Sequence, residues 1–161
     1  MTDLTVRRAE PVDYEVICEL ADQMDAPLRQ NLPDRFRRPE GAVRRRDQLE
    51  HYIADDNTFL AIAELDGRAV GVVNSCLKPM PDFPQKKPLR SLLIRGIVVR
   101  DGYRRQGVGT ALYRAAQEWA ASRGATEVQA NVYDFDKATL AFLKHLGFSP
   151  LSHRLVRPLA D

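Results

Sequence analysis

The sequence predicts an α/β fold in which helices cover a mixed β-sheet. Two short apolar runs meet at Asp66-Gly67, a dipeptide typical of hairpin turns, and this indicates antiparallel pairing in the N-terminal half. Strand and helix patterns alternate after residue 89, which favours parallel strands. The chain has 161 residues, the length of one domain, so we expect residues 1–161 to form a single domain.

The N-terminal third predicts one strand followed by two helices. A strand is expected at 4–8, and Pro11 opens the first helix, which Pro27 and Pro33 are expected to end. A second helix is predicted over 42–54, beginning in a basic run. The buried stripe of the first helix recurs at helical spacing and comprises Val16, Ile17, Leu20, Ala21 and Met24.

Three strands are predicted in the middle of the chain. The hairpin joins strands at 58–65 and 69–77. Prolines recur between 79 and 88, and because proline cannot donate to a strand ladder, this segment is expected to be a loop. The strand at 89–99 has an almost continuous apolar run, so we place it in the interior of the sheet.

The C-terminal part of the chain alternates between helix and strand patterns. A helix over 107–122 follows a basic turn, and its apolar positions recur at helical spacing. A strand is expected at 127–133 and a further helix at 136–145. A last strand is predicted over 152–157.

Composition and charge exclude several classes of protein. The formal net charge is only +2, so composition predicts neither nucleic acid nor a membrane surface as a partner. No apolar run approaches the roughly 20 residues of a membrane span, and the N-terminus lacks the apolar core of a signal peptide. We therefore expect a cytoplasmic protein. The histidines show no metal-ligand spacing, and no metal site is predicted.

The turn before the helix at 107–122 has the features of a phosphate site. Residues 104–110 read Arg-Arg-Gln-Gly-Val-Gly-Thr. A helix start presents unpaired N–H groups and the positive end of the helix dipole, and glycines let an anion approach the backbone closely. The flanking arginines suit phosphate. The alternative is a helix N-terminus that glycine makes flexible, with arginines that contact only solvent.

The spacing of the glycines shows which of the known phosphate-binding motifs this loop fits. A Walker A loop needs four residues between its glycines and a following lysine, whereas Gly107 and Gly109 are one residue apart. A dinucleotide fingerprint needs a third glycine at position 112, which is Leu112. The pattern Arg/Gln-x-x-Gly-x-Gly/Ala fits at every position, beginning at Arg104.

The stretch over 97–112 that contains this pattern looks like the acetyl-CoA signature of the GNAT superfamily of N-acetyltransferases. The stretch over 136–148, which ends in Leu-Gly-Phe, resembles a second feature of the family, and the order of elements also matches. The resemblance implies the GNAT fold. That fold has mostly antiparallel N-terminal strands, a parallel and splayed central pair, and helices on both faces.

The resemblance also implies roles for individual residues, with acetyl-CoA as the cosubstrate and no metal. The strand end at Ile97, Val98 and Val99 would pair with the pantetheine arm, in a splay between this strand and the strand at 127–133. The pyrophosphate would lie against the following loop. The residues implied in holding it are Arg104, Arg105, Gln106, Gly107, Val108, Gly109 and Thr110.

Four positions near the implied active cleft depart from the family pattern. The tyrosine that usually protonates the departing thiolate is replaced by Leu143. The Asn and Ala that usually occur earlier in the same helix are Asp136 and Thr139, and a strand carboxylate that can act as a base is replaced by Arg95. These changes are compatible with catalysis, because positioning the amine beside the thioester and backbone N–H groups on the thioester oxygen can supply much of the rate.

Two kinds of residue near the cleft are candidates for handling protons. Tyr133 is the candidate substitute acid, with a packed strand aromatic as its alternative role. Asp134 and Asp136 are the nearest carboxylates, and turn or helix-cap roles are their alternatives.

The predicted function is transfer of an acetyl group from acetyl-CoA to the primary amine of a small molecule, directly in a ternary complex. The acceptor pocket is expected to involve the first two helices, the stretch over 29–41 and the loop over 79–88. Alternatives are a catalytically weak or inactive acyl-CoA-binding regulatory module, a protein N-acetyltransferase, and an interaction domain that binds no CoA. By family habit, a homodimer is expected.

Overall fold

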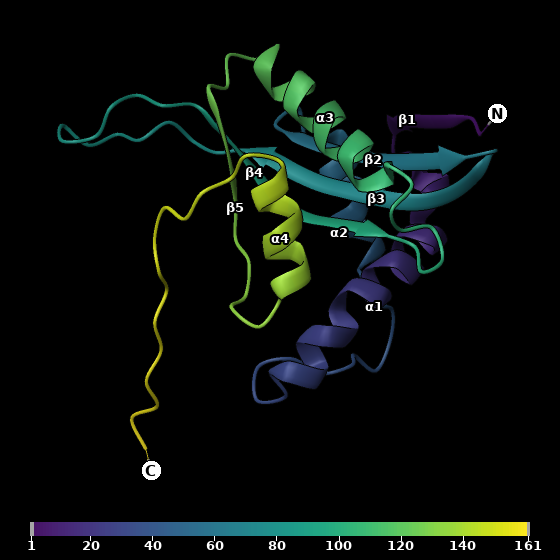
Figure 1. Cartoon of the computed structure of the whole chain (residues 1–161), viewed down its shortest axis with the longest axis horizontal. Coiled ribbons are helices and arrows are strands. Elements are labelled where there is room, and N and C mark those ends of the chain that lie inside the picture. Colours follow the sequence, from purple (N-terminus) through teal and green to yellow (C-terminus); the bar gives the residue numbers. More distant parts are fainter. Residues whose placement is uncertain (1, 161) are drawn as a thin grey trace. The chain divides into compact units, whose positions relative to one another are not determined.

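The computed structural model describes residues 2–160 (Figure 1). Within these residues the strands are β1 (Leu4–Arg8), β2 (Thr58–Leu65), β3 (Arg68–Leu77), β4 (Ser91–Val99) and β5 (Glu127–Ala130). The helices are the short 3-10 helix η1 (Pro11–Asp13), α1 (Tyr14–Asn31), α2 (Arg46–Ala54), α3 (Val108–Ala121) and α4 (Lys137–His145). The chain divides into two compact units at Asn131/Val132, and α4 belongs to the second unit.

The strands of the first unit form one mixed sheet in the order β1-β2-β3-β4-β5, which confirms the predicted fold class. β1 to β4 pair antiparallel, whereas β4 and β5 pair parallel. β4 therefore lies inside the sheet, as its continuous apolar run predicts. The hairpin between β2 and β3 turns at Asp66 and Gly67, whose φ angles of 51° and 77° are the left-handed values that such a turn needs.

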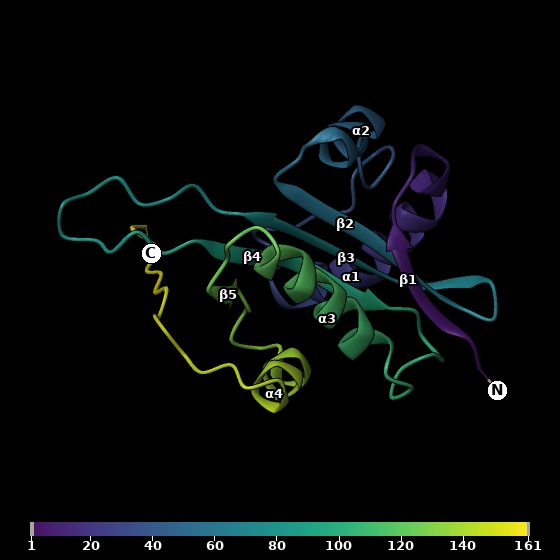
Figure 2. The ribbon, with the colours of Figure 1, turned by 90° about the horizontal axis from the view of Figure 1, so that it is seen from above.

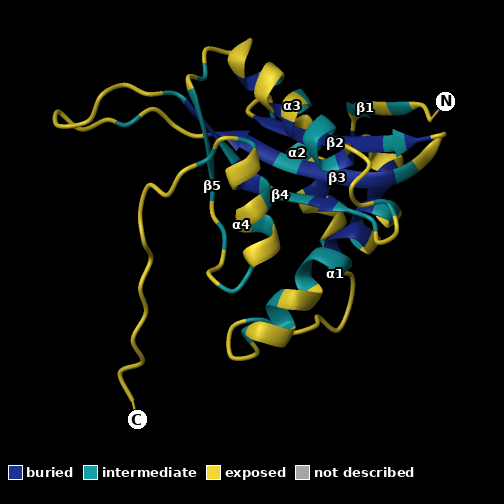
Figure 3. Cartoon of the chain, in the orientation of Figure 1, coloured by how far each residue is buried: buried dark blue, intermediate teal, exposed yellow. Residues whose placement is uncertain are grey.

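Helices cover both faces of this sheet. On one face, α3 packs Leu112 and Ala116 against Val73 and Leu92 in a fully buried cluster. On the other face, Leu20 of α1 and Leu49 of α2 pack against neighbouring strands. Figure 2 shows α2 and α3 on opposite sides of the strands, and Figure 3 shows that the strands are the most deeply buried part of the unit. Because successive side chains of a strand point to opposite faces of the sheet, the apolar strands contribute side chains to both buried clusters.

A β-bulge interrupts β4 at Arg95. Opposite β3, Asn74 pairs with Gly96 and Ser75 pairs with Ile94, so Arg95 is the extra residue. The parallel pairing with β5 ends at the same point, at Ile94 and Ala130. A bulge bends a strand and disrupts its ladder, which explains why the strand predicted over 127–133 ends at Ala130. Beyond Ile94, no residue in 2–160 pairs with the β5 side of β4 as a strand.

Two predictions about the N-terminal helices are wrong in their limits. α1 does not end at Pro27 but continues to Asn31. Proline removes one helix hydrogen bond, and Arg29 bridges this turn with an ion pair to Asp22 at 2.9 Å. The helix predicted over 42–54 begins only at Arg46, because the residue before it is extended.

The second unit, described by itself, contains α4 and the segment that follows. The side chain of Asp136 caps α4 by accepting hydrogen bonds from the N–H of Thr139 at 3.0 Å and from its hydroxyl at 2.7 Å. The C-terminal end closes where the N–H of Phe148 donates to the Leu143 carbonyl at 3.0 Å. The helix predicted over 136–145 is thus confirmed, including the cap role of Asp136.

The strand predicted over 152–157 is wrong: residues 149–160 contain no strand. A strand is defined by backbone pairing with a neighbour, and residues 2–160 offer this segment no such pairing. Its large apolar side chains are exposed instead, namely Leu151, Leu155, Val156 and Leu159. The proline-containing segment between β3 and β4 is a loop, as predicted.

Candidate functional site

The loop between β4 and α3 is anchored firmly at its start. The N–H of Arg100 donates to the Val70 carbonyl at 2.7 Å, and its guanidinium donates to the Ala69 carbonyl at 3.2 Å. The N–H of Tyr103 then closes a turn onto the Arg100 carbonyl at 3.0 Å. These bonds tie the loop to the start of β3, so its remaining residues are held at a defined place beside the sheet.

The same loop ends in an open helix N-terminus. Gly107 is the N-cap of α3, and its φ of 82° is left-handed, a conformation that glycine adopts without strain. Having no side chain, Gly107 cannot cap the helix, and the first helix bond is that of the Ala111 N–H to the Gly107 carbonyl at 2.9 Å. Within residues 2–160, the backbone N–H groups of Gln106 to Thr110 donate to no partner.

This open N-terminus has the chemistry of an anion site. Its N–H groups and the helix dipole attract negative charge. No atom lies within 4 Å of where a Cβ of Gly107 would be, so there is space beside the backbone. Arg104 and Arg105 are exposed next to it, and Arg104 makes only an exposed ion pair with Asp101 at 3.4 Å. The structure therefore brings together the residues predicted over 104–110.

The edge of β4 beyond the bulge is partly occupied by a side chain from α1. The amide of Gln23 donates to the Val99 carbonyl at 2.8 Å and accepts from the Asp101 N–H at 3.0 Å. Val99 and Ile97 are half-buried there, whereas Val98 is buried on the face covered by α1 and α2. Gln23 could not be predicted from the sequence, because its partners lie 76 and 78 residues away along the chain and no local pattern indicates the contact.

A cavity of about 250 Å³ lies on the face of the sheet that α1 and α2 cover. α1 and α2 were expected to contribute to an acceptor pocket, and both do line this cavity, whereas residues 29–41 and 79–88 do not. Its floor is formed by β2, β3 and β4. The lining residues are Ile17, Ala21, Met24, Arg44, Arg45, Gln48, Leu49, Tyr52, Leu60, Val72, Asn74, Arg95, Gly96 and Val98.

The β4 bulge lets two consecutive residues line this cavity. In a regular strand neighbouring side chains point to opposite faces, whereas Arg95 and Gly96 both contribute here. Gly96 allows a close approach of α1, because a Cβ there would lie 2.8 Å from Sδ of Met24. Arg95 lies over the ring of Tyr52, with Cζ 4.9 Å from the ring centroid.

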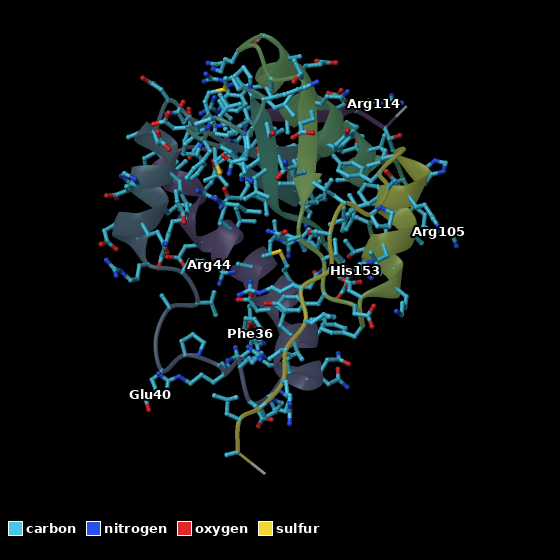
Figure 4. All side chains as sticks on the ribbon, turned by 90° about the vertical axis from the view of Figure 1, so that its left-hand side faces the viewer. Phe36, Glu40, Arg44, Arg105, Arg114 and His153 are labelled. Carbon is cyan, nitrogen blue, oxygen red and sulfur yellow. The ribbon has the colours of Figure 1, made fainter. Side chains whose placement is uncertain are left out.

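Arg44 forms one side of the cavity and is fixed by several contacts. Its guanidinium donates to both carboxylate oxygens of Asp25, at 2.6 and 3.0 Å, and these bonds raise the pKa of Arg44. Its carbonyl accepts from the Tyr14 hydroxyl at 2.8 Å. Arg44 lies on the segment leading into α2 and Arg105 on the loop before α3, and both are labelled in Figure 4.

The candidate proton-handling residues are in the second unit. Tyr133 is 46% exposed and stacks on Phe135 with ring centroids 6.0 Å apart. Asp134 forms an exposed ion pair with Lys137 at 3.5 Å. Leu143, at the position of the usual tyrosine, is buried. The catalytic role of Tyr133 stays a prediction.

Two further properties concern the described part of the chain. Residues 2–160 contain no group of three or more histidine, cysteine, aspartate or glutamate side chains placed to hold a metal ion. None of their helices combines the length and apolar character needed to cross a membrane.

A glycine-capped helix N-terminus lies next to a bulged and half-paired strand, an arrangement whose chemistry suits a phosphate-bearing ligand. The chain belongs to the acetyltransferase (GNAT) family, whose sequence profile matches residues 25–148. The match includes the bulge, the loop before α3 and the cavity-lining residues from Arg44 onward.

Curated relatives are acetyltransferases from distant organisms. The chain is 35% identical over 86 residues to acetyl transferase GW6a of Oryza sativa subsp. japonica, covering 52% of this chain and 20% of the relative. It is 31% identical over 94 residues to an aminoglycoside N(6')-acetyltransferase type 1 of Klebsiella aerogenes, covering 58% of this chain and 60% of the relative. The chain thus spans less than two thirds of the length of these relatives.

Solved structures share the fold. A mutant of the BH1408 protein from Bacillus halodurans superimposes with a TM-score of 0.91 at 19% identity, covering 97% of this chain and 99% of the other. The aminoglycoside acetyltransferase AAC(6')-Iy, in complex with a bisubstrate analogue of CoA, gives a TM-score of 0.76 at 18% identity and covers 99% of both chains. At these identities the likeness concerns the fold alone.

Proposed function

We propose that this protein is an N-acetyltransferase that moves an acetyl group from acetyl-CoA to the primary amine of a small molecule, directly in a ternary complex. The observation that carries the proposal is the open N-terminus of α3, where the N–H groups of Gln106 to Thr110 have no partner within residues 2–160. Such groups bind a diphosphate without rearrangement.

The first unit supplies a consistent set of contacts for the cosubstrate. The loop amides would bind its pyrophosphate, with Arg104 and Arg105 adding positive charge. The pantetheine arm would pair with the β4 edge beyond the bulge. Because Gln23 already engages the Val99 carbonyl at 2.8 Å, this pairing would use the backbone of Ile97 and the N–H of Val99.

Acetyl-CoA supplies the acetyl thioester for the transfer. The amine nitrogen forms a bond to the carbonyl carbon, the carbon–sulfur bond breaks, and the amine loses a proton to water or a nearby base. Leu143 has no acidic proton, so it cannot protonate the leaving sulfur. A thiol has a pKa of about 8.5 and leaves readily as thiolate, and Tyr133 is the residue we propose for any proton it receives.

The comparisons support a small-molecule acceptor. One curated relative and several fold neighbours bear the name aminoglycoside acetyltransferase, including one neighbour solved in complex with sisomicin. An amine acceptor is therefore the class we propose.

A second candidate function is an acyl-CoA-binding module that does not turn over. The buried Leu143, in place of a proton donor, is the observation that favours it. This candidate and the enzyme predict the same acetyl-CoA binding, and only the enzyme predicts release of CoA thiol when an amine is added. A thiol-trapping assay with a panel of amines distinguishes the two.

The test of the acetyl-CoA site is a thermal melt with increasing acetyl-CoA, on the native protein and two variants. Gly107→Glu places a carboxylate at the proposed pyrophosphate position. Gly124→Glu is the matched control, because Gly124 has the same left-handed backbone, with φ of 83° against 82°, and equally open surroundings. It lies beyond the other end of α3.

We expect the native protein and Gly124→Glu to melt at higher temperature with acetyl-CoA. At a ligand concentration of 100 times Kd the stabilisation is about 2.7 kcal/mol, or roughly 5–10 °C for a chain of this size. Gly107→Glu should show no shift. A native protein that does not respond at millimolar acetyl-CoA would refute the proposal.

We further propose that the chain is one cytoplasmic GNAT domain that forms a homodimer. Support for the dimer comes from the segment over 149–160, where Leu155 is 90% and Leu159 fully exposed. Apolar side chains of this size are favourably covered by a partner. Sedimentation velocity on the native chain would contradict the dimer if it gave a monomer at micromolar concentration.

A further inference from the structure

The cavity between α1, α2 and the sheet has an unusual balance of charge. Its charged lining residues are Arg44, Arg45 and Arg95, and no aspartate or glutamate among residues 2–160 lines it. A polycationic amine would therefore meet guanidinium groups and no carboxylate among the lining residues, which is unfavourable.

The charges of two of these arginines are already offset. Arg44 is held by both oxygens of Asp25. Arg45 forms a two-pronged ion pair with Asp47. Neither is free to give its full charge to a ligand without losing an existing partner.

Arg95 differs from both, because its guanidinium has no ion pair and no hydrogen bond within residues 2–160. It rests on the Tyr52 ring, with Cζ 4.9 Å from the centroid. Stacking holds the planar guanidinium in place and leaves its N–H donors available for a bidentate contact with an anion. Arg95 lies on the cavity face by the regular alternation that follows Ile94, and the lack of a polar partner within residues 2–160 makes it available to a ligand.

A second polar group in the cavity lacks a partner. The side-chain oxygen of Asn74 is buried and accepts no hydrogen bond within residues 2–160. Asn74 is paired in register with Gly96, the residue next to Arg95. A buried acceptor of this kind calls for a donor, and the N–H of an amine would supply one.

We infer that the acceptor carries an anionic group, a carboxylate or a phosphonate-like acid, on the same small molecule as its amine. Arg95 binds the anionic group, and the Asn74 side-chain oxygen accepts a hydrogen bond from the amine. The inference rests on the proposed acetyl transfer and selects an amino acid-like acceptor in place of the aminoglycosides named among the relatives.

The experiment compares acceptors that differ only in the anionic group. The carboxylates are glycine, 3-aminopropanoate and 4-aminobutanoate, each paired with its neutral amide, and 2-aminoethylphosphonate is paired with ethanolamine. Kanamycin represents the polycations. CoA release gives kcat/KM for each acceptor, and the KM for acetyl-CoA is measured in parallel.

Three variants assign the preference to Arg95. Arg95→Gln removes the charge, and Arg95→Lys keeps it without the bidentate geometry. Arg123→Gln is the matched control, since Arg123 also lies over an aromatic ring, with Cζ 4.5 Å from the Trp119 centroid, and lies outside the cavity lining. Arg95 is exposed, so its replacement leaves folding intact.

We expect acids to exceed their neutral partners in kcat/KM by about tenfold or more, the factor that one charge-assisted contact supplies. The ratio of kcat/KM between an acid and its neutral partner should be about one in Arg95→Gln, intermediate in Arg95→Lys and the same as in the native protein in Arg123→Gln. The KM for acetyl-CoA should not change. Equal use of acids and amides, a preference for kanamycin, or an unchanged ratio in Arg95→Gln would overturn the inference.

A failure of acetyl transfer itself is recognised separately. If no amine releases CoA, the same acid and amide pairs are titrated into the CoA-saturated protein by calorimetry. Tighter binding of the acids that is lost in Arg95→Gln supports the inference, and equal binding overturns it. The acetyl-CoA melt tests the cosubstrate site independently, and the CoA-release assay tests acetyl transfer.

Discussion

Gly71 on β3 packs closely against α3, and Gly71→Ala tests how that approach supports the proposed acetyl-CoA loop. A Cβ at this position would lie 3.0 Å from Cδ1 of Leu112 and 3.1 Å from Cγ1 of Val108, both on α3. It would also lie 3.0 Å from the Val98 carbonyl oxygen. The carbonyl is part of the sheet and cannot rotate away, so α3 must move.

The magnitude follows from two opposing effects. Overpacking a tight core costs about 1–3 kcal/mol. Replacing glycine by alanine restricts the unfolded chain and returns about 0.4–1 kcal/mol. The net destabilisation should be about 1–2 kcal/mol, which lowers Tm by roughly 2–8 °C for a chain of this size.

The assay is a thermal melt combined with titration of acetyl-CoA. Because Val108 is the first residue of α3, moving it displaces the open N–H groups, and we expect Kd for acetyl-CoA to rise along with the loss of Tm. The control is Gly41→Ala, where no atom lies within 4 Å of the new Cβ. Its Tm should stay the same or rise slightly.

The close approach also predicts coupling between the two sides of the contact. The double variant Gly71→Ala/Val108→Ala removes the close contact between the new Cβ and Cγ1 of Val108. The double variant should therefore lose less stability than the sum of the losses in the two single variants. An unchanged Tm in Gly71→Ala, or strict additivity in the double variant, would refute the reasoning that α3 is held by this contact.

Three further predictions concern other parts of the chain. Hydrogen bonds from Arg7 lower the pKa of Asp13 below 3.8, so above pH 3.8 Asp13→Asn should reduce the free energy of unfolding by about 2 kcal/mol. This loss should vanish as pH falls through the lowered pKa, which urea unfolding curves measured at a series of pH values would test. Asp136→Ala removes the α4 cap and should cost about 1 kcal/mol in urea unfolding, with Asp134→Ala near neutral. Deleting 149–160 should turn the proposed dimer into a monomer in sedimentation velocity, and an unchanged mass would contradict the role of that segment.

Local features of the chain could be predicted because their cause is local. The hairpin at Asp66 and Gly67 and the glycine-capped start of α3 each depend on the backbone freedom of a few neighbouring residues. The same holds for the Asp136 cap, whose donor is only three residues away. In each case the residue types that make the feature possible stand side by side in the sequence.

The parts that could not be predicted depend on distant contacts. Gln23 meets the end of β4 across 76 residues of chain, and Asn74 shares the cavity with Arg95 only because β3 and β4 pair. The strand predicted over 152–157 had a suitable composition, but residues 2–160 provide no neighbour for it to pair with.

The sequence by itself determined the fold class, the order of the elements and the phosphate-type loop, because periodicity, turn residues and helix-start chemistry act over short stretches of chain. Only the tertiary structure decided where β5 ends. It also decided that, among the cavity residues, Arg95 has no carboxylate partner within residues 2–160 and the side-chain oxygen of Asn74 has no hydrogen-bond donor there. These depend on the bulge at Arg95 and on the side chains that packing brings together. A one-residue bulge changes the face to which each following residue points, and that change places Gly96 and Val98 beside Arg95 on the cavity face.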